Sequence, residues 1–325
     1  MNLDFFIGDG MPGTEPLSVS VVIPTLNRHR ALTRALSSVL AQTLTPNLRA
    51  EVVVVDNSLD SNARAVVEGL SAGAPIPIRY IAMPRPGIAT ARNTGIAAAR
   101  GAWIAFLDDD ETAGPDWLTS LLGVVERGGY DAAFGPVSAR AEEGQEIGPF
   151  AAYFARGVTA PDGADVTRFS AYLGTNNSMF AAALCQVPGG PFEEQLNNIG
   201  GEDSLFLHRL AHEGRRFGWA AQAKVTEWVP PRRLDWGYVR RRRFLSGQIR
   251  TFVHDMARPR SRASVARWMC VGVAQTLVSG ALSLLLKPIN PPAARHHRIA
   301  ACGGLGKVFW MPRFRVSLYG TGLVS

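Results

Sequence analysis

Cysteine and long uncharged runs are both scarce in this sequence of 325 residues. The three cysteines, at positions 185, 270 and 302, are widely spaced and odd in number. They exclude a disulfide scaffold and a CxxC zinc site, and they favour a reducing compartment. The first 13 residues contain two aspartates and no basic residue, so we predict no secretory signal there.

Charged residues make up 19% of the chain and hydrophobic residues 46%, which excludes a disordered protein. The charges are unbalanced, because 34 Lys and Arg face 27 Asp and Glu, giving a net charge of +7. Such an excess suits an anionic partner, and we expect a nucleotide or an anionic membrane surface. Nucleic acid is not an expected partner, since no recognition motif accompanies the basic residues.

The first third of the chain alternates between strand and helix patterns. Residues 19–23, 51–55, 78–81 and 103–107 read as strands, several of them rich in valine and isoleucine. Between them, apolar residues recur at helical spacing over 32–40, and residues 88–100 form an alanine-rich helical segment. This alternation predicts an α/β fold with a mainly parallel sheet.

In open parallel sheets, ligands bind beyond the carboxyl ends of the strands, so the segments that follow the strands are the candidates for a site. Those segments are 24–28, 56–58, 84–87 and 108–111. Three of the four are polar or charged. We expect them to converge on one edge of the sheet.

The segment Asp108 to Glu111 places four carboxylates at the end of an apolar strand. Carboxylates crowded together repel one another unless a cation lies between them, and hard oxygen ligands suit Mg²⁺ or Mn²⁺. A solvated acidic turn before the next helix is the simpler alternative. The apolar strand before the segment and the other polar segments at the same edge favour the metal.

Two further residues at this edge have chemical roles open to them. Asp56 can accept hydrogen bonds from a ribose or a base, or it can simply form a turn. Gly87 frees the backbone at a helix start, where backbone N–H groups and the helix dipole favour an anion. Arg92, one or two turns into that helix, can reach a phosphate or brace the carboxylates.

Together these segments resemble glycosyltransferase family 2, whose members have the GT-A fold, a nucleotide-diphospho-sugar transferase fold. The resemblance rests on VVIPTLNR at 21–28, VVDNS at 54–58, GIATARNTG at 87–95, FLDDD at 106–110 and GED at 201–203. It covers residues 18–250, and the order and spacing agree throughout. Within the family, the sequence is similar to bacterial exopolysaccharide transferases of the succinoglycan type.

The resemblance implies inverting transfer of a sugar from a nucleotide sugar, with Mg²⁺ or Mn²⁺ as cofactor. Asp108 and Asp110 match the DXD motif, with Asp110 as the metal ligand and Asp108 facing the ribose or a metal-bound water. Asp56 matches the residue that reads the base, and Asp203 matches the catalytic base. The residues assigned to donor binding are Pro24, Thr25, Asn27, Arg28, Asp56, Arg92, Asp108, Asp109 and Arg242.

The chemistry of inversion supports a base remote from the metal. An acceptor hydroxyl must attack the anomeric carbon on the face opposite the leaving diphosphate, and a carboxylate must accept its proton. Asp203 comes from a different part of the chain than Asp110, as this arrangement requires. Glu202 and Asp203 could instead cap the helix that follows, and the two roles are compatible.

Several weaker candidates stay open. Asn176 and Asn177 are expected to line the donor-sugar or acceptor pocket. Trp228 and Trp236 could stack on sugar rings or serve packing equally well. His208 and His212 are four residues apart on a predicted helix but have no evident third metal ligand, so they read as ordinary helix positions.

The run Arg240 to Arg243 sits in an aromatic, basic segment. Related enzymes have such a segment near the donor diphosphate, so one or two of these arginines, Arg242 among them, are expected to cover the leaving group when a lid closes. Contact with anionic lipid is the alternative, and the two do not exclude each other.

Residues 268–286 form an uncharged run of 19 residues, about 28 Å as a helix, which barely spans a hydrocarbon core of about 30 Å. Gly272, Gln275, Thr276, Ser279 and Ser283 share one helical stripe. This pattern favours a peripheral or monotopic membrane helix over a true span or a buried soluble helix. The tail 303–325, with aromatics at 309, 310, 314 and 319, is a candidate second membrane contact.

We therefore expect an N-terminal tail at 1–17, a GT-A domain at 18–250 and a basic, apolar membrane-associating helical region at 251–325. The expected activity is metal-dependent, inverting glycosyl transfer from a UDP-sugar to a lipid-linked or oligosaccharide acceptor, in bacterial surface polysaccharide synthesis at the cytoplasmic face of the inner membrane. The alternatives are a nucleotidyl transferase and a nucleotide-sugar-binding protein without transferase activity.

Overall fold

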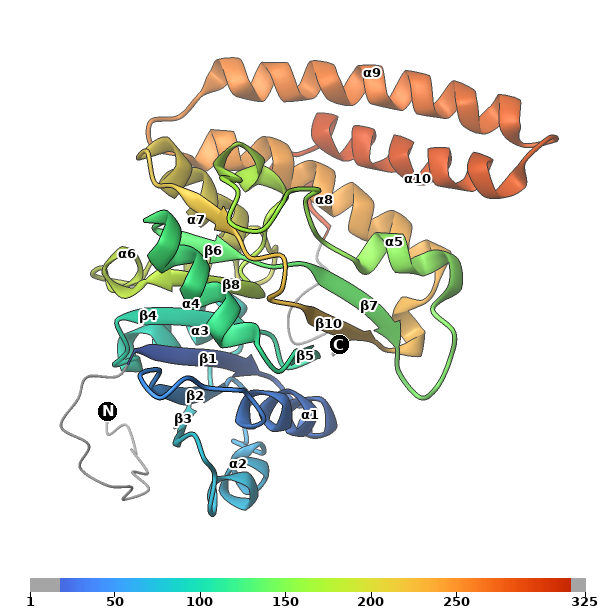
Figure 1. Cartoon of the computed structure of the whole chain (residues 1–325). Coiled ribbons are helices and arrows are strands. Elements are labelled where there is room, and N and C mark those ends of the chain that lie inside the picture. Colours follow the sequence, from blue (N-terminus) through green and yellow to red (C-terminus); the bar gives the residue numbers. More distant parts are fainter. Residues whose placement is uncertain (1–17, 317–325) are drawn as a thin grey trace.

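A seven-stranded sheet with the strand order β3-β2-β1-β4-β8-β6-β9 forms the centre of the computed structural model, which describes residues 18–316 (Figure 1). Strands β1 (Val19–Thr25), β2 (Ala50–Asp56), β3 (Ile78–Ala82) and β4 (Trp103–Leu107) are parallel to one another. The four predicted strands agree with these bounds to within two residues, and the predicted α/β class with a mainly parallel sheet is confirmed.

The other half of the sheet is mixed. Strand β8 (Asn177–Ala181) runs antiparallel to both β4 and β6 (Ala132–Phe134), and β9 (Phe217–Trp219) is parallel to β6. Because β8 runs antiparallel to β4, the start of β8 lies beside the end of β4. The loop before β8 therefore borders the edge formed by the ends of β1 and β4.

Helices cover both faces of the sheet, and a separate hydrophobic core lies between each face and its helices. One core packs α1 (His29–Leu40), α2 (Arg64–Ser71) and α4 (Trp117–Gly128) against one face of the sheet. The other packs α3 (Ile88–Ala98), α6 (Ala182–Cys185) and α7 (Glu202–His212) against the opposite face. The valine-rich strands β1 and β2 alternate between the two cores, which explains why they are buried along their whole length.

A second, three-stranded sheet in the order β5-β10-β7 stands beside the edge of the first. It consists of β5 (Glu111–Ala113), β7 (Val137–Ala141) and β10 (Val225–Val229), with the short helix α5 (Ala151–Phe154) packed nearby. Its register places Glu227 opposite Glu111. A residue far along the chain is thereby brought to the acidic turn after β4.

Three long helices, α8 (Trp236–Met256), α9 (Arg262–Leu286) and α10 (Pro291–Val308), form a layer on one side of the molecule (Figure 1). The domain boundary expected at residue 250 falls inside α8, and the chain leaves the helix only after Met256. The expected tail from residue 303 begins inside α10, where Gly303, Gly304 and Gly306 are buried. Residues 1–17 and the tail beyond 316, with Tyr319, lie outside the described residues.

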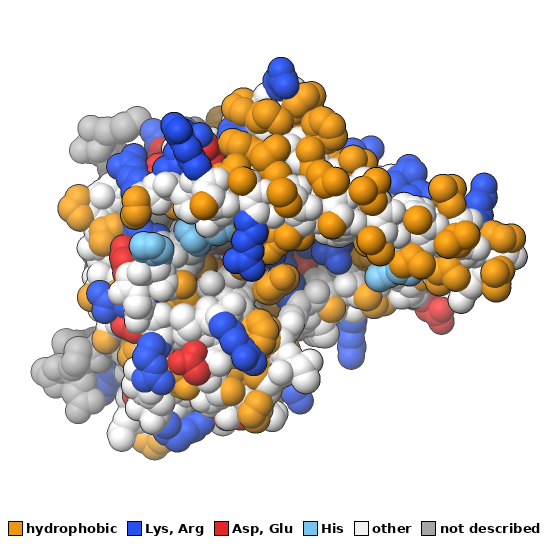
Figure 2. Space-filling view, turned by 90° about the horizontal axis from the view of Figure 1, so that it is seen from above, with side chains coloured by type: hydrophobic (Ala, Val, Ile, Leu, Met, Phe, Trp, Pro, Cys, Tyr) orange, Lys and Arg blue, Asp and Glu red, His pale blue; other side chains and the backbone are white. Residues whose placement is uncertain are grey.

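Helix α9 turns its small and polar face toward the protein and its apolar face outward. Gly272, Ser279 and Ser283 are buried, and the Ser283 hydroxyl donates to the Ala294 carbonyl oxygen of α10 at 2.8 Å. Leu284 and Leu285 are 74% and 67% exposed. Hydrophobic side chains gather along this outer face in Figure 2. The predicted polar stripe is thus a protein-docking face.

Candidate active site

The carboxyl ends of β1 and β4, the start of α7 and one face of α8 enclose a cavity of about 860 Å³. A cavity of this volume is in the range of small-molecule and cofactor sites. Of the residues assigned to the site from the sequence, those that line it are Pro24, Thr25, Arg28, Arg92, Asp108, Asp109, Asp110, Asp203 and Arg242. Asn27 and Asp56 are not among the lining residues.

The loop after β1 is tied to the acidic turn after β4. The Thr25 hydroxyl donates to Asp109 at 2.8 Å, and the Arg28 guanidinium donates to Asp109 at 2.9 Å and to Asp110 at 3.0 Å. Asn27 instead adopts a left-handed conformation, with φ of 56°, and its side-chain oxygen accepts from Asn62 at 2.6 Å outside the cavity. As placed, Asn27 shapes the loop rather than the cavity wall.

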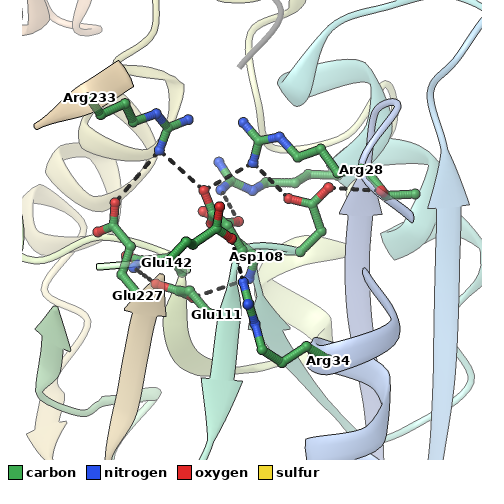
Figure 3. A network of polar contacts seen from close by, with 12 residues as sticks. Arg28, Arg34, Asp108, Glu111, Glu142, Glu227 and Arg233 are labelled. Carbon is green, nitrogen blue, oxygen red and sulfur yellow. Dashed lines mark hydrogen bonds and ion pairs between the residues drawn. The ribbon is translucent and has the colours of Figure 1, made fainter. Parts of the chain in front are cut away.

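Asp110 lies between two guanidinium groups. Arg233 donates to the same Asp110 oxygen as Arg28, at 3.2 Å, and it approaches Glu227 at 3.8 Å (Figure 3). Burial alone would raise the pKa of Asp110, but the two arginines outweigh it and hold the pKa below its usual value. Asp110 is therefore an anion in the folded protein.

Asp109 is the more deeply placed carboxylate of the turn. Burial raises its pKa to about 6, against the lowering effect of Arg28. Both of its oxygens accept hydrogen bonds from the β1 loop. These contacts lock the turn to the loop.

Arg92, buried in α3, joins the two ends of the site. It donates to Asp108 at 2.9 Å and to Glu202 at 2.7 Å. Of the two roles open to Arg92 from the sequence, the contacts match that of a brace for carboxylates. Burial and the neighbouring Asp203 raise the pKa of Glu202 to about 7, although Arg92 opposes this.

Glu111, Glu227 and Arg233 complete the network. The sequence placed Glu111 in the acidic segment without a role of its own, and it did not assign Glu227 or Arg233 to the site. Burial, followed by the charges of Asp108, Asp110 and Glu227, raises the pKa of Glu111 well above its usual value. Asn176 donates to Glu111 and accepts from Arg156 at 3.0 Å. The sequence features that pointed to these residues were the acidic run, for Glu111, and the high density of arginines near residue 233.

Asp56 is fully buried and accepts four hydrogen bonds from its own surroundings. Its donors are the backbone and hydroxyl of Ser58, the backbone of Ala63 at 2.8 Å and the hydroxyl of Tyr80 at 2.8 Å. In this arrangement Asp56 organises the loop after β2, and its neighbour Asn57 is the residue that lines the cavity.

Asp203 stands in the first turn of α7, next to Glu202, which Arg92 links to Asp108 of the acidic turn. One carboxylate oxygen accepts from the Ser204 backbone N–H at 2.6 Å. The other points toward Gly174, where a Cβ atom would come within 3.5 Å of it. Asp203 lines the cavity. The capping alternative is wrong, because Gly201 is the N-cap residue and no side chain caps the helix, whereas Asp203 in the first turn stays available for proton transfer.

The weaker candidates divide between the cavity and the surrounding packing. Asn176 lines the cavity, whereas Asn177 is buried and accepts from the Trp117 indole at 2.8 Å. Trp228 is covered by Arg34, and Trp236 packs on Phe150 with ring centroids 4.5 Å apart. Neither tryptophan is among the lining residues. His208 lines the cavity beside His254, with ring centroids 4.7 Å apart.

The acidic turn offers oxygen donors only, which is the set that Mg²⁺ and Mn²⁺ prefer. Among residues 18–316, no group of three or more His, Cys, Asp and Glu side chains is arranged to hold a metal ion. Such a site fits an ion that takes one or two carboxylates and completes its shell with substrate phosphates and water.

Comparison with known proteins identifies the family. The family model described as "Glycosyl transferase family 2" matches residues 20–177, and "Glycosyl transferase family group 2" matches residues 103–311. The chain is 34% identical over 238 residues to "Succinoglycan biosynthesis protein ExoM" of Rhizobium meliloti, covering 72% of this chain and 74% of that protein. The chain belongs to glycosyltransferase family 2. This confirms the resemblance inferred from the sequence and shows that the protein is a glycosyltransferase enzyme.

Solved structures confirm the GT-A fold. The mannosyltransferase PcManGT of Pyrobaculum calidifontis, in complex with GDP-Man and Mn²⁺, superposes with a TM-score of 0.56 at 20% identity, covering 91% of this chain and 89% of its own. S. aureus TarS 1–349 in complex with UDP-GlcNAc gives a TM-score of 0.51 at 18% identity, covering 90% of each chain.

Proposed function

We propose that this glycosyltransferase moves a sugar, with inversion, from a nucleotide sugar to a saccharide or lipid-linked acceptor in bacterial surface polysaccharide synthesis. A UDP-sugar is the proposed donor. The observation that carries the proposal is a single cavity lined both by a paired acid–arginine network and by the carboxylate of Asp203. The similarity to a succinoglycan biosynthesis protein supports the polysaccharide class.

The donor would bind at the edge of the sheet. Thr25 and Arg28 hold the loop after β1 against the acidic turn, so both walls of a nucleotide site are in place before the ligand arrives. Two neighbours of this fold carry nucleotide sugars, UDP-GlcNAc in one and GDP-Man in the other. Asp56 retains the proposed role toward the base only if binding changes its four hydrogen bonds.

Asp110 and Asp108 would hold Mg²⁺ or Mn²⁺ together with the donor diphosphate, and a neighbour of this fold binds Mn²⁺ beside its donor. Such an ion neutralises the charge that develops on a departing diphosphate. Asp110 suits this role because its two arginine partners keep it ionised.

Asp203 would act as the general base. Its carboxylate takes the proton of the acceptor hydroxyl while the hydroxyl oxygen bonds to the anomeric carbon. The bond from that carbon to the diphosphate oxygen breaks, and the nucleoside diphosphate leaves. The Ser204 backbone N–H holds one Asp203 oxygen at 2.6 Å, which orients the other toward the cavity side of Gly174.

We further propose that α9 attaches the enzyme to the cytoplasmic face of the inner membrane by lying in the interface. Its exposed side is apolar, and exposed basic residues flank it at Arg258, Arg262, Arg267 and Lys287. Among the described helices, α9 is long and apolar enough to cross a membrane by length and composition. A crossing would however carry the packed α10, with Arg295 and Arg298, into the hydrocarbon.

A donor screen tests the proposal. Purified protein is offered UDP-, GDP- and dTDP-sugars with Mn²⁺ or with EDTA, and nucleoside diphosphate release is measured with and without a saccharide acceptor. We expect release from one nucleotide class, abolished by EDTA and by Asp110→Asn.

The control is Asp116→Asn, a carboxylate beyond the acidic turn that is not among the cavity-lining residues. It should behave as wild type. Tight donor binding with no transfer to any acceptor, in protein that is folded, would favour the nucleotide-sugar-binding alternative.

A further inference from the structure

The cavity face of α8 carries a surplus of positive charge. Arg242, Arg243, Arg250 and His254 all line the cavity from this helix. Arg243 and Arg250 are seven residues apart, two helical turns, so they project from the same face at about 10 Å separation along the axis. This face therefore presents a short basic row to the cavity.

No carboxylate of the described residues forms an ion pair with this row, although the charge of Arg242 acts on the buried Glu227 and opposes the rise in the pKa of that carboxyl. Within residues 18–316, the structure gives no ion pair to Arg242, Arg243 or Arg250. Arg242 lies over the Phe154 ring at 4.7 Å, and one of its terminal nitrogens is buried without a hydrogen-bond partner. Buried donors without partners are rare in folded proteins, so the Arg242 end of the row has capacity for an anion. Arg243 and Arg250 add positive charge to the same cavity without an ion pair of their own among the described residues.

The electrostatic consequence extends to a neighbouring lysine of α10. Burial lowers the pKa of Lys307 to about 8, with Arg250 and Arg243 adding to the effect. Burial and Arg243 likewise lower the pKa of Arg250. These cations destabilise one another, and a bound anion would relieve that repulsion.

The row lies on the Asp203 side of the cavity. Ile249, next to Arg250, contacts Gly201 just before α7, so closely that a Cβ atom on Gly201 would come within 3.0 Å of it. Arg250 also lies over the Tyr172 ring at 4.4 Å, in the segment before β8. By contrast, Arg28, Arg92 and Arg233 at the sheet edge already have two carboxylates each.

The same row touches the apolar helix layer. Arg250 approaches the Trp268 ring of α9 at 5.4 Å, and Lys307 donates to Gln275 of α9 at 2.5 Å. The opposite face of α9 is the exposed apolar surface of Figure 2. An anion bound by the row would thus be separated by the thickness of helix α9 from the exposed apolar face of that helix.

We propose that Arg243 and Arg250 bind the phosphate or diphosphate of the sugar acceptor, an anion carried on an apolar chain, and that this site is separate from the donor diphosphate site. The inference rests on the proposed function, and it names the residues that hold the acceptor. Arginine suits the task because its planar fork binds phosphate oxygens in pairs.

Calorimetric titration of the full chain, with UDP saturating, tests the proposal. The probe is farnesyl diphosphate, and farnesol and inorganic pyrophosphate are compared with it. We expect Arg243→Gln/Arg250→Gln to weaken farnesyl diphosphate binding about tenfold or more while UDP affinity stays within about twofold. Arg240→Gln, which removes the same charge from α8 outside the cavity lining, should change neither.

Arg243 is exposed, so the single variant Arg243→Gln carries the test if the double variant is unstable. Weaker UDP binding in the variants would assign the arginines to the donor and overturn the proposal. So would loss of binding to phosphatidylglycerol vesicles with farnesyl diphosphate binding unchanged, since that would indicate a lipid headgroup. Failure of wild type to bind UDP or any nucleotide sugar would instead contradict the proposed function.

Discussion

At the sheet edge, Arg28, Arg92 and Arg233 each contact two carboxylates, whereas on α8 Arg242 and Arg250 lie against aromatic rings. In the first region every arginine is paired within the chain, and the five carboxylates that these three arginines contact leave an excess of negative charge. The second keeps cations without carboxylate partners around the same cavity. The acidic excess of the first region suits a cation, and the cations of the second region suit an anion, so the two regions suit different ligands at one site.

The largest expected effect concerns Asp203. Asp203→Asn removes the proposed proton acceptor, so transfer to an acceptor should fall by about 10²–10⁴-fold. Donor affinity should stay near wild type, because Asp203 is not among the residues assigned to donor binding and asparagine keeps the shape of the side chain. Rate and donor-binding measurements on the same preparation check this. Unchanged transfer would assign the base elsewhere.

A matched pair of substitutions sharpens the comparison directly. Arg233→Met leaves Asp110 and Glu227 short of a counter-charge in a buried site, and it should lower the free energy of unfolding by roughly 3–5 kcal/mol. Arg250→Met removes only contacts with Tyr172 and Trp268 and should cost about 1 kcal/mol or less. Urea denaturation measures both. Equal losses would contradict the distinction between paired and unpaired arginines.

The third prediction uses pH. The folded protein holds a proton on Glu202 up to a pKa of about 7, whereas its usual value is 4.5. Between these values the folded state binds more protons than the unfolded state, so this residue makes the free energy of unfolding fall as the pH rises.

Glu202→Gln removes that contribution. The difference in unfolding free energy between variant and wild type should therefore shift in favour of the variant between pH 4.5 and 7. Denaturation curves across this range measure it, and parallel pH profiles would show that Glu202 titrates normally.

The smallest effect on stability is expected at α9. Leu284→Ser/Leu285→Ser changes exposed side chains, so the free energy of unfolding should move by no more than about 0.5 kcal/mol per site. Binding to anionic vesicles should nevertheless decrease. Leu59→Ser provides the control, because Leu59 is 71% exposed on another part of the molecule. Equal vesicle binding by both variants would exclude α9 as the contact.

The strands and the polar segments that follow them could be predicted because both depend on local pattern. Valine-rich runs predict buried strands, and parallel strands bring their carboxyl ends together whatever the loops do. Thr25, Arg28 and the acidic turn accordingly meet in the structure. The sequence could not show which residue of a loop would face the cavity. Asp56 accepts hydrogen bonds within its own loop, and Asn57 lines the cavity instead.

Two features could not be predicted from the sequence: contacts that depend on long-range strand pairing, and the full length of a glycine-rich helix. Glu227 and Arg233 reach the acidic turn only through the three-stranded sheet, and no periodic pattern indicates which strand will pair with β5. The C-terminal region was expected to be helical, but the continuation of α10 past residue 303 was not predicted, because Gly303, Gly304 and Gly306 lower helix propensity. The close approach of neighbouring helices explains their presence there.

Those glycines have a mechanical consequence. A Cβ atom on Gly247 of α8 would collide with the backbone of Gly303, and one on Gly304 would come within 2.7 Å of the Gly272 carbonyl oxygen of α9. Backbone packed against backbone leaves three helices little freedom to slide. We therefore expect the outer apolar surface of α9 and the cavity wall beside Asp203 to move as one rigid unit. If α9 contacts a lipid surface as proposed, this rigid unit would set the distance of the reacting centre from the lipid and therefore how far an acceptor sugar must extend.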